Sequence, residues 1–161
     1  LDEEPTVKVS AKSEYAVRAM VYLARSFGQG PVPLSQVAER EHIPLDFLEQ
    51  VMLLLRNAGL VKSMRGVHGG YLLASAPEGV TVGAVMAAVE GPPVPVSCID
   101  ALADDQQTCN MGVLMLDCST RDVWVTLYER ISETLNGISL ADLCREHTQP
   151  NITPLPMAAR A

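Results

Sequence analysis

Three cysteines lie close together in the second half of the chain. Cys98, Cys109 and Cys118 fall within 21 residues, whereas Cys144 stands apart from them. Deprotonated thiols are soft, anionic ligands for iron–sulfur clusters and zinc, and they are also the groups that oxidants attack. The three thiols therefore predict metal or redox chemistry, and an iron–sulfur cluster, a zinc site and reactive free thiols all remain open.

The cellular compartment decides whether such thiols stay reduced. The N-terminus, Leu1-Asp2-Glu3-Glu4, is acidic and lacks the basic start and apolar stretch of a secretory signal. No apolar run reaches the roughly 18 residues that a membrane span needs. We therefore expect a cytoplasmic protein with no membrane partner and no structural disulfides.

Charge is distributed unevenly along the 161 residues, whose net charge is −7. Residues 8–74 carry eight basic and five acidic side chains, whereas residues 75–161 carry four basic and eleven acidic ones. The overall charge argues against a nucleic-acid partner, but the basic first half does not. The pattern indicates a chain with two roles, one in each half.

The apolar periodicity predicts helices and one hairpin. Ser13 is the expected N-cap of a helix over residues 13–27, and Thr81 is the expected N-cap of a helix over 81–90. Further helices are expected at 34–41, 44–58, 119–135 and 140–147, and strands at 61–64 and 71–74 enclose a glycine-rich tip. Three helices followed by such a hairpin are the order of a winged helix-turn-helix. We expect a mostly α-helical fold with a small β-hairpin and a long C-terminal helix.

The helix at 44–58 is the expected DNA-reading element, because its apolar side can be buried while its polar side faces outward. Glutamate can accept a hydrogen bond from cytosine and glutamine can pair with adenine, so Glu49 and Gln50 are the expected base readers, with Asp46 beside them. The expected phosphate contacts are Arg56, Lys62, Arg65, Lys12 and Arg40, and His68 at the hairpin tip is expected to meet DNA. Arg65 is also a candidate for insertion into the minor groove.

Six short segments together resemble one family. They are residues 14–20 (EYAVRAM), 47–51 (FLEQV), 56–66 (RNAGLVKSMRG), 69–74 (GGYLLA), 81–83 (TVG) and 89–91 (VEG). The chain resembles the bacterial Rrf2 family of winged-helix regulators, which includes an iron–sulfur cluster regulator and a nitric-oxide-sensing repressor. The resemblance extends over residues 8–143. It implies a homodimer that docks two recognition helices on a palindromic operator in double-stranded DNA.

The resemblance also implies how the dimer forms and what the cysteines do. The helix at 119–135 would pair with its twin through Trp124, Leu127 and Ile131, although this stripe could instead pack on its own winged domain. Cys98, Cys109 and Cys118 occupy the segment in which sensory members hold an iron–sulfur cluster. The gaps of ten and eight residues between them are longer than is usual in those members. A 2Fe–2S cluster is favoured, with 4Fe–4S as the alternative.

A fourth ligand is needed beside three cysteines. Some relatives use an acidic residue of the first helix, contributed by the other subunit, and Glu14 aligns with it. Others use a histidine three residues after the last cysteine, where this chain has Arg121, which cannot ligate. Glu14 could equally form an ion pair with Arg18, four residues along the same helix.

These predictions define a four-part organisation. A winged helix-turn-helix domain covers 8–90, a cysteine-bearing sensory loop 91–118, a dimerisation helix with a short following helix 119–147, and a tail 148–161. The predicted function is a transcriptional regulator, with repression the expected direction, whose DNA affinity depends on an iron–sulfur cluster that senses redox state, nitric oxide or cluster supply. The alternative is a cluster-free thiol-redox or zinc-carrying interaction protein without operator binding. An enzyme is not expected, because no nucleophile–base set or phosphate loop is evident.

Overall fold

The computed structural model describes residues 9–93 and 119–145 of the chain. The helices are α1 (Ala11–Arg25), α2 (Leu34–Glu41), α3 (Leu45–Asn57), α4 (Val82–Glu90), α5 (Arg121–Asn136) and α6 (Leu140–Cys144), with a 3-10 turn η1 at Pro77–Gly79. The strands β1 (Val61–Met64) and β2 (Gly70–Leu73) form an antiparallel hairpin. This order confirms the mostly helical winged-helix fold, and none of the described helices is long and apolar enough to cross a membrane.

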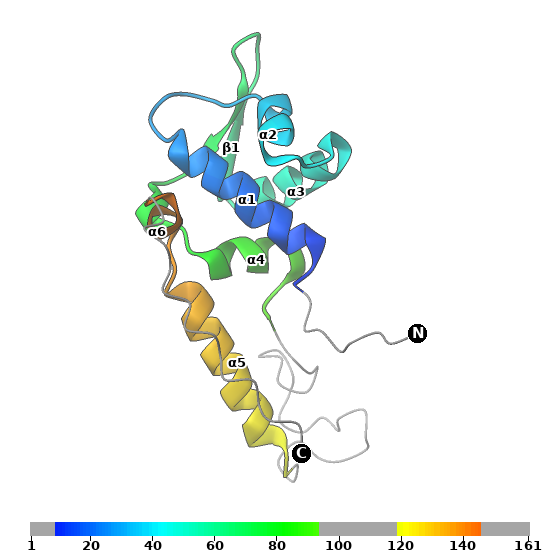
Figure 1. Cartoon of the computed structure of the whole chain (residues 1–161), viewed down its shortest axis with the longest axis vertical. Coiled ribbons are helices and arrows are strands. Elements are labelled where there is room, and N and C mark those ends of the chain that lie inside the picture. Colours follow the sequence, from blue (N-terminus) through cyan, green and yellow to red (C-terminus); the bar gives the residue numbers. More distant parts are fainter. Residues whose placement is uncertain (1–8, 94–118, 146–161) are drawn as a thin grey trace.

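Helix α1 is the centre of the core. It contacts α2, α3, α4, α6 and β2, and Figure 1 shows it lying between α4 and the rest of the winged unit. Ala16, Ala19 and Met20 on its inner face are completely buried. Small alanines let neighbouring helices approach closely, so α1 holds the reading elements and α4 in one packed body.

The start of α1 differs from the prediction. The helix begins at Ala11 and its N-cap is Ser10, whose hydroxyl oxygen accepts a hydrogen bond from the Ser13 amide at 3.2 Å. Ser13 is completely buried inside the first turn, and its hydroxyl donates to Oε2 of Glu90 at 2.6 Å. The Ser10 hydroxyl donates to the other oxygen of Glu90. Predicting Ser13 as the cap was wrong, because its hydroxyl serves a contact between helices.

The turn between α2 and α3 is tight. His42 adopts the left-handed conformation at φ 54°, and the amide of Ile43 donates to the carbonyl of Ala38 at 3.0 Å. Ile43 is buried beneath the turn. The predicted bounds of α2 are confirmed, and α3 begins one residue later than predicted because Pro44 is its N-cap.

The hairpin is fixed to the core at its base. Val61 pairs with Leu73, and both side chains are buried. Tyr71 exchanges two backbone hydrogen bonds with Val32, each 2.8 Å long. The segment after α1 therefore pairs with β2 through an isolated antiparallel bridge. Gly70 lies against the Val32 carbonyl, where any Cβ would collide with the backbone.

Helix α5 is joined to the winged unit through its C-terminal end. Thr81 and Ser139 form an antiparallel bridge. The Val82 amide donates to the Ile138 carbonyl at 2.9 Å, and the Leu140 amide donates to the Val80 carbonyl at 2.8 Å. The Leu140 side chain is completely buried. The rest of α5 extends away from the winged unit, as Figure 1 shows.

Several predicted bounds need correction. Helix α1 ends at Arg25, so Phe27 lies outside it and is 48% exposed. Helix α5 begins at Arg121 instead of residue 119, and α6 ends at Cys144 instead of residue 147. Residues 94–118 of the loop predicted at 91–118, and the whole tail predicted at 148–161, lie outside the described residues.

We expect the contact between α1 and α4 to make stability depend on pH. Hydrogen bonds from Ser10 and Ser13, with the charge of Lys12, hold the pKa of Glu90 below its ordinary value. A carboxylate with a lowered folded pKa stabilises the fold above its unfolded pKa of about 4.3, and this contribution is lost as pH falls through the folded pKa. Glu90→Gln should therefore lower the free energy of unfolding at pH 7, with a smaller deficit at pH 3. Urea unfolding at both pH values tests this.

The matched control is Glu78→Gln, at an exposed glutamate on the 3-10 turn. It should follow the wild type at both pH values. A Glu90→Gln deficit of the same size at pH 7 and pH 3 would contradict the assignment.

Candidate DNA-binding surface and sensory segment

The outer face of α3 presents the predicted base readers. Asp46, Glu49 and Gln50 are all exposed, as the apolar spacing predicted. The opposite face is completely buried and consists of Leu48, Val51, Met52 and Leu55. The core therefore fixes the rotation of α3, and the polar stripe can reach base edges without disturbing the fold. Contact with bases stays a prediction.

Basic side chains lie on α3 itself and on α2 and β1, which both contact it. Arg56 is in the last turn of α3, Arg40 is in the last turn of α2, and Lys62 lies on β1. These three, together with Arg65 just after β1, are exposed. Four cations near an acidic recognition helix can offset its repulsion from phosphates.

Lys12 lies elsewhere. It is half-buried in the first turn of α1, where its charge acts on Glu90. Figure 1 shows this end of α1 on the side away from the hairpin. The structure thus does not bring Lys12 to the wing, and its contact with a phosphate stays a prediction.

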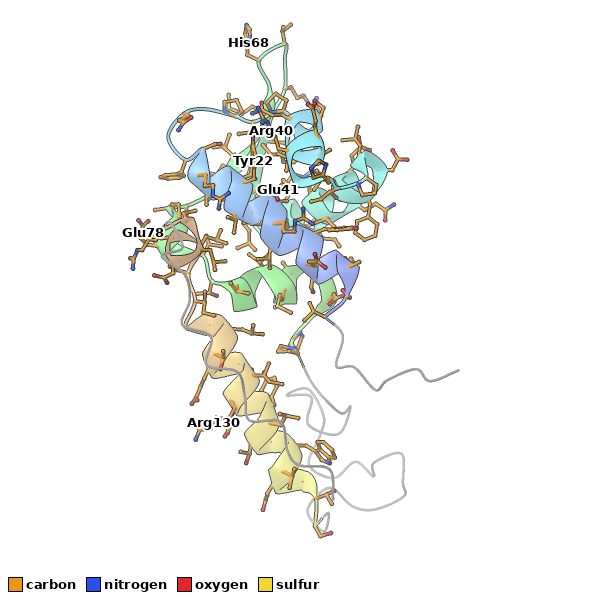
Figure 2. All side chains as sticks on the ribbon, viewed as in Figure 1. Tyr22, Arg40, Glu41, His68, Glu78 and Arg130 are labelled. Carbon is orange, nitrogen blue, oxygen red and sulfur yellow. The ribbon has the colours of Figure 1, made fainter. Side chains whose placement is uncertain are left out.

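His68 is exposed at the tip of the hairpin, as Figure 2 shows. The tip projects beyond the rest of the winged unit, so His68 and Arg65 can reach a groove or backbone that α3 does not occupy.

Glu14 is on the exposed side of the first turn of α1. Its carboxylate lies 3.7 Å from Arg18, and the Glu14 side chain is 60% exposed. Arg18 has a closer partner, because its Nε is 3.3 Å from Oε2 of Glu41 and its guanidinium also donates to the Glu41 carbonyl. The predicted ion pair between Glu14 and Arg18 is therefore present, but Arg18 lies closer to Glu41 than to Glu14.

The three clustered cysteines lie outside the described residues, and among the described ones no group of three or more His, Cys, Asp or Glu could hold a metal ion. The bonds from Ser10 and Ser13 to Glu90 place the end of α4 against the first turn of α1. The segment that carries Cys98 follows α4 and leaves the described structure at Pro93. It therefore begins near the turn that carries Glu14.

Cys144 belongs to the packing of α6. The thiol lies 3.9 Å from the Val21 carbonyl and packs against the core, in agreement with its prediction as a core thiol. Burial raises the pKa of this thiol, although the charge of Arg25 opposes the shift. A protonated thiol is a poor metal ligand, so Cys144 differs in character from a sensory cysteine.

The apolar stripe on α5 is largely uncovered. No residue of α5 is buried, and Leu127 and Val123 are 41% and 60% exposed. Trp124 and Ile131 are half-buried. A shallow hollow of about 220 Å³ lies between α4 and α5, lined by Gly83, Ala84, Ala87, Pro92, Pro93, Tyr128, Ser132, Leu135 and Asn136. Packing on the same chain therefore uses a face of α5 that does not include Leu127.

One link in this site could not be predicted from the sequence. Glu90 connects α4 to α1 through two serines that are 80 and 77 residues away. Two serines three residues apart are an ordinary capping pattern, so no local signal reveals a partner on another helix.

Comparison with known proteins decides the family. Residues 9–146 match the family model Rrf2, described as an iron-dependent transcriptional regulator. The chain belongs to the Rrf2 family. It is 41% identical over 138 residues to the transcriptional regulator IscR of Erwinia tasmaniensis, an alignment that covers 85% of this chain and 78% of that one.

Two solved structures of Rrf2 relatives are similar along most of their length. The global cysteine regulator CymR of Bacillus subtilis superposes with a TM-score of 0.68 at 33% identity, covering 86% of this chain and 97% of CymR. IscR of T. potens superposes with a TM-score of 0.66 at 39% identity, covering 85% of each chain. The protein is thus a DNA-binding transcriptional regulator of the Rrf2 family and not an enzyme.

We expect residues that contact phosphates and residues that contact bases to differ in how their removal changes the salt dependence and the sequence dependence of binding. Lys62→Ala should weaken binding about equally on all sequences and reduce the slope of log K against log salt by about 1. Gln50→Ala should cost about 1–3 kcal/mol at one base position and leave the slope unchanged. Fluorescence anisotropy with a selected operator and its single-base variants, at several salt concentrations, measures both.

Arg145→Ala is the matched control, because Arg145 is exposed just after α6 and paired with Asp142 at 3.2 Å. It should change neither quantity. If Gln50→Ala weakened all sequences equally, Gln50 would not be a base reader.

Proposed function

We propose that this Rrf2 protein is a homodimeric repressor of a palindromic operator, and that an iron–sulfur cluster held by Cys98, Cys109 and Cys118 controls its DNA affinity. The observation that carries the proposal is the position of these thiols in the sequence. They lie in the segment that connects α4, which is packed into the DNA-reading unit, to α5, whose apolar face is uncovered.

The donor set suits an iron–sulfur cluster. Three thiolates supply soft, anionic ligands, and a longer spacing is tolerated because the entropy of loop closure grows slowly with length. The description of the family model as iron-dependent supports iron over zinc. When bound, a cluster of this kind supplies redox and ligand-exchange chemistry at a site whose stability depends on oxidants and nitric oxide.

Glu14 is the proposed fourth ligand, contributed by the other subunit. Its release from Arg18 costs little, because an exposed ion pair is worth about 0–1 kcal/mol and Arg18 keeps its bonds to Glu41. A carboxylate is a hard ligand for iron, so it exchanges more readily than a thiolate. A replaceable fourth ligand suits a sensor.

The dimer is proposed to form through α5. Val123, Leu127 and Ile131 follow one another at intervals of four residues on one stripe of the helix. A second copy of α5 would cover this stripe, as in an antiparallel or crossed helix pair. Because α5 is joined to the winged unit at Ile138–Leu140, the pairing angle of the two helices would set the distance between the two recognition helices.

A second candidate function is regulation by thiol oxidation without a cluster. The similarity to CymR of Staphylococcus aureus, a relative whose structure is described as an oxidized form, favours it. It uses the same cysteines and the same DNA-binding surface, so only the state of the thiols separates the two.

The dimer is tested with Leu127→Asp. A buried charge at the helix pair would dissociate the dimer, and affinity for a palindrome should fall at least about tenfold, since each 1.4 kcal/mol of lost contact is a factor of ten. Analytical ultracentrifugation gives the mass, and circular dichroism reports whether the protomer remains folded. Thr126→Asp is the matched control, because its side chain points about 100° away round the helix. A variant Leu127→Asp that remained a dimer would refute the proposed interface.

The cluster is tested by visible absorption of protein purified under nitrogen. The wild type should be coloured and contain iron, and serine variants of Cys98, Cys109 or Cys118 should lose both. Cys144→Ser is the control and should keep both, because Cys144 packs against the core. A colourless, iron-free wild type with three reduced thiols excludes the cluster, and oxidant-dependent loss of operator binding would then support the second candidate.

A further inference from the structure

The hairpin tip can present only two side chains at its end. The Gly69 amide donates to the Gly66 carbonyl at 3.0 Å, which closes a turn around Val67 and His68. Gly66 has φ +116°, a conformation that L-residues with side chains rarely adopt. A Cβ on Gly69 would lie 2.9 Å from the Gly66 carbonyl oxygen and closer still to that of Met64. Both flanking positions therefore require glycine.

Val67 is the most exposed large hydrophobic residue in the part of the chain that the structure describes. Its exposed fraction is 98%, whereas the next in rank, Val9, is 61% exposed. It packs on nothing in its own fold, so burial against a partner would remove its whole side chain from water. Its neighbours in the tip include Arg65 and His68, whose chemistry suits phosphates and base acceptors.

We propose that Val67 is a specificity-determining residue, which enters the minor groove beside each half-site and selects A·T over G·C pairs there. The inference rests on the DNA-binding function and uses a different groove from that of α3. A·T pairs expose only acceptors in the minor groove, whereas guanine adds a 2-amino donor. Valine has no acceptor for that donor, so a G·C pair beneath Val67 leaves a buried polar group unpaired.

The shape of valine favours this role. Its β-branched side chain has few rotamers, so little freedom is lost when it becomes fixed between the sugar walls of the groove. A·T tracts have a narrow minor groove, in which a small apolar group contacts both walls. The exposed cation Arg65 is attracted to the same narrow groove, so the two side chains prefer the same sequences.

The experiment begins with an operator selected by the full-length protein from random DNA. Hydroxyl-radical footprinting locates the base pairs next to the tip. Those A·T pairs are then replaced by G·C or by inosine·C, which lacks the 2-amino group but keeps the major-groove pattern of G·C close to unchanged. Wild type should bind the G·C operator about tenfold more weakly and the inosine operator nearly as well as the original.

Two variants separate Val67 from its neighbour. Val67→Ala shortens the apolar side chain and should reduce the tenfold preference to about threefold or less, while penalties for changes under α3 stay the same. His68→Ala is the matched control, and it should change overall affinity and keep the preference. Neither residue contributes to the core, so folding is not at issue.

The possible outcomes are distinct. Equal binding of all three operators by wild type, or a full tenfold preference in Val67→Ala, overturns the inference and leaves the DNA-binding function intact. A selection that enriches no sequence overturns operator binding itself, and the inference with it. Crosslinking of the tip to a protein in place of DNA would show that Val67 serves a protein partner and would likewise overturn the inference.

Discussion

The short backbone bridge between residues 80–82 and 138–140 is the constraint on which the regulator depends. It joins the end of α5 to the start of α4 by two hydrogen bonds of 2.8 and 2.9 Å, and the buried Leu140 anchors it. Apart from this bridge, α4 is the only described element that α5 contacts extensively. A helix held at one end can swing at the other, so the unanchored end, which follows the cysteine segment, is the end that can be moved.

Electrostatics on the reading face are a balance of opposing charges. Asp46 and Glu49 repel phosphates, whereas Arg56, Lys62 and Arg65 attract them. Phosphate contacts provide affinity without sequence information. An acidic helix lowers the affinity for DNA in which no base donates a hydrogen bond to its carboxylates. We expect such a surface to bind most DNA weakly, and in the proposed dimer affinity would depend on how well both recognition helices fit together. A fit of this kind is sensitive to small changes in their separation.

The sequence could predict what is local, and it could not predict what is joined through space. The bounds of α2, the Thr81 cap and the outward face of α3 follow from periodicity and capping over a few residues. The role of Ser13 was mispredicted because its partner Glu90 is 77 residues away. For the sensory site, the residue types were the informative signal, and Cys98, Cys109 and Cys118 remain a prediction because they lie outside the described residues.

Helix α1 connects the recognition helix α3 to the end of α4, where the cysteine segment begins. Its first turn carries Glu14 and is held to the end of α4 through Glu90, and its inner face packs against α3. The completely buried Ala16 and Ala19 leave little room for sliding between these helices. A displacement at the end of α4, where the cysteine segment begins, would therefore move α1 and the recognition helix together as one body. In the proposed dimer, regulation would then rotate whole reading units about the bridge to α5, and the recognition helix would keep its own shape.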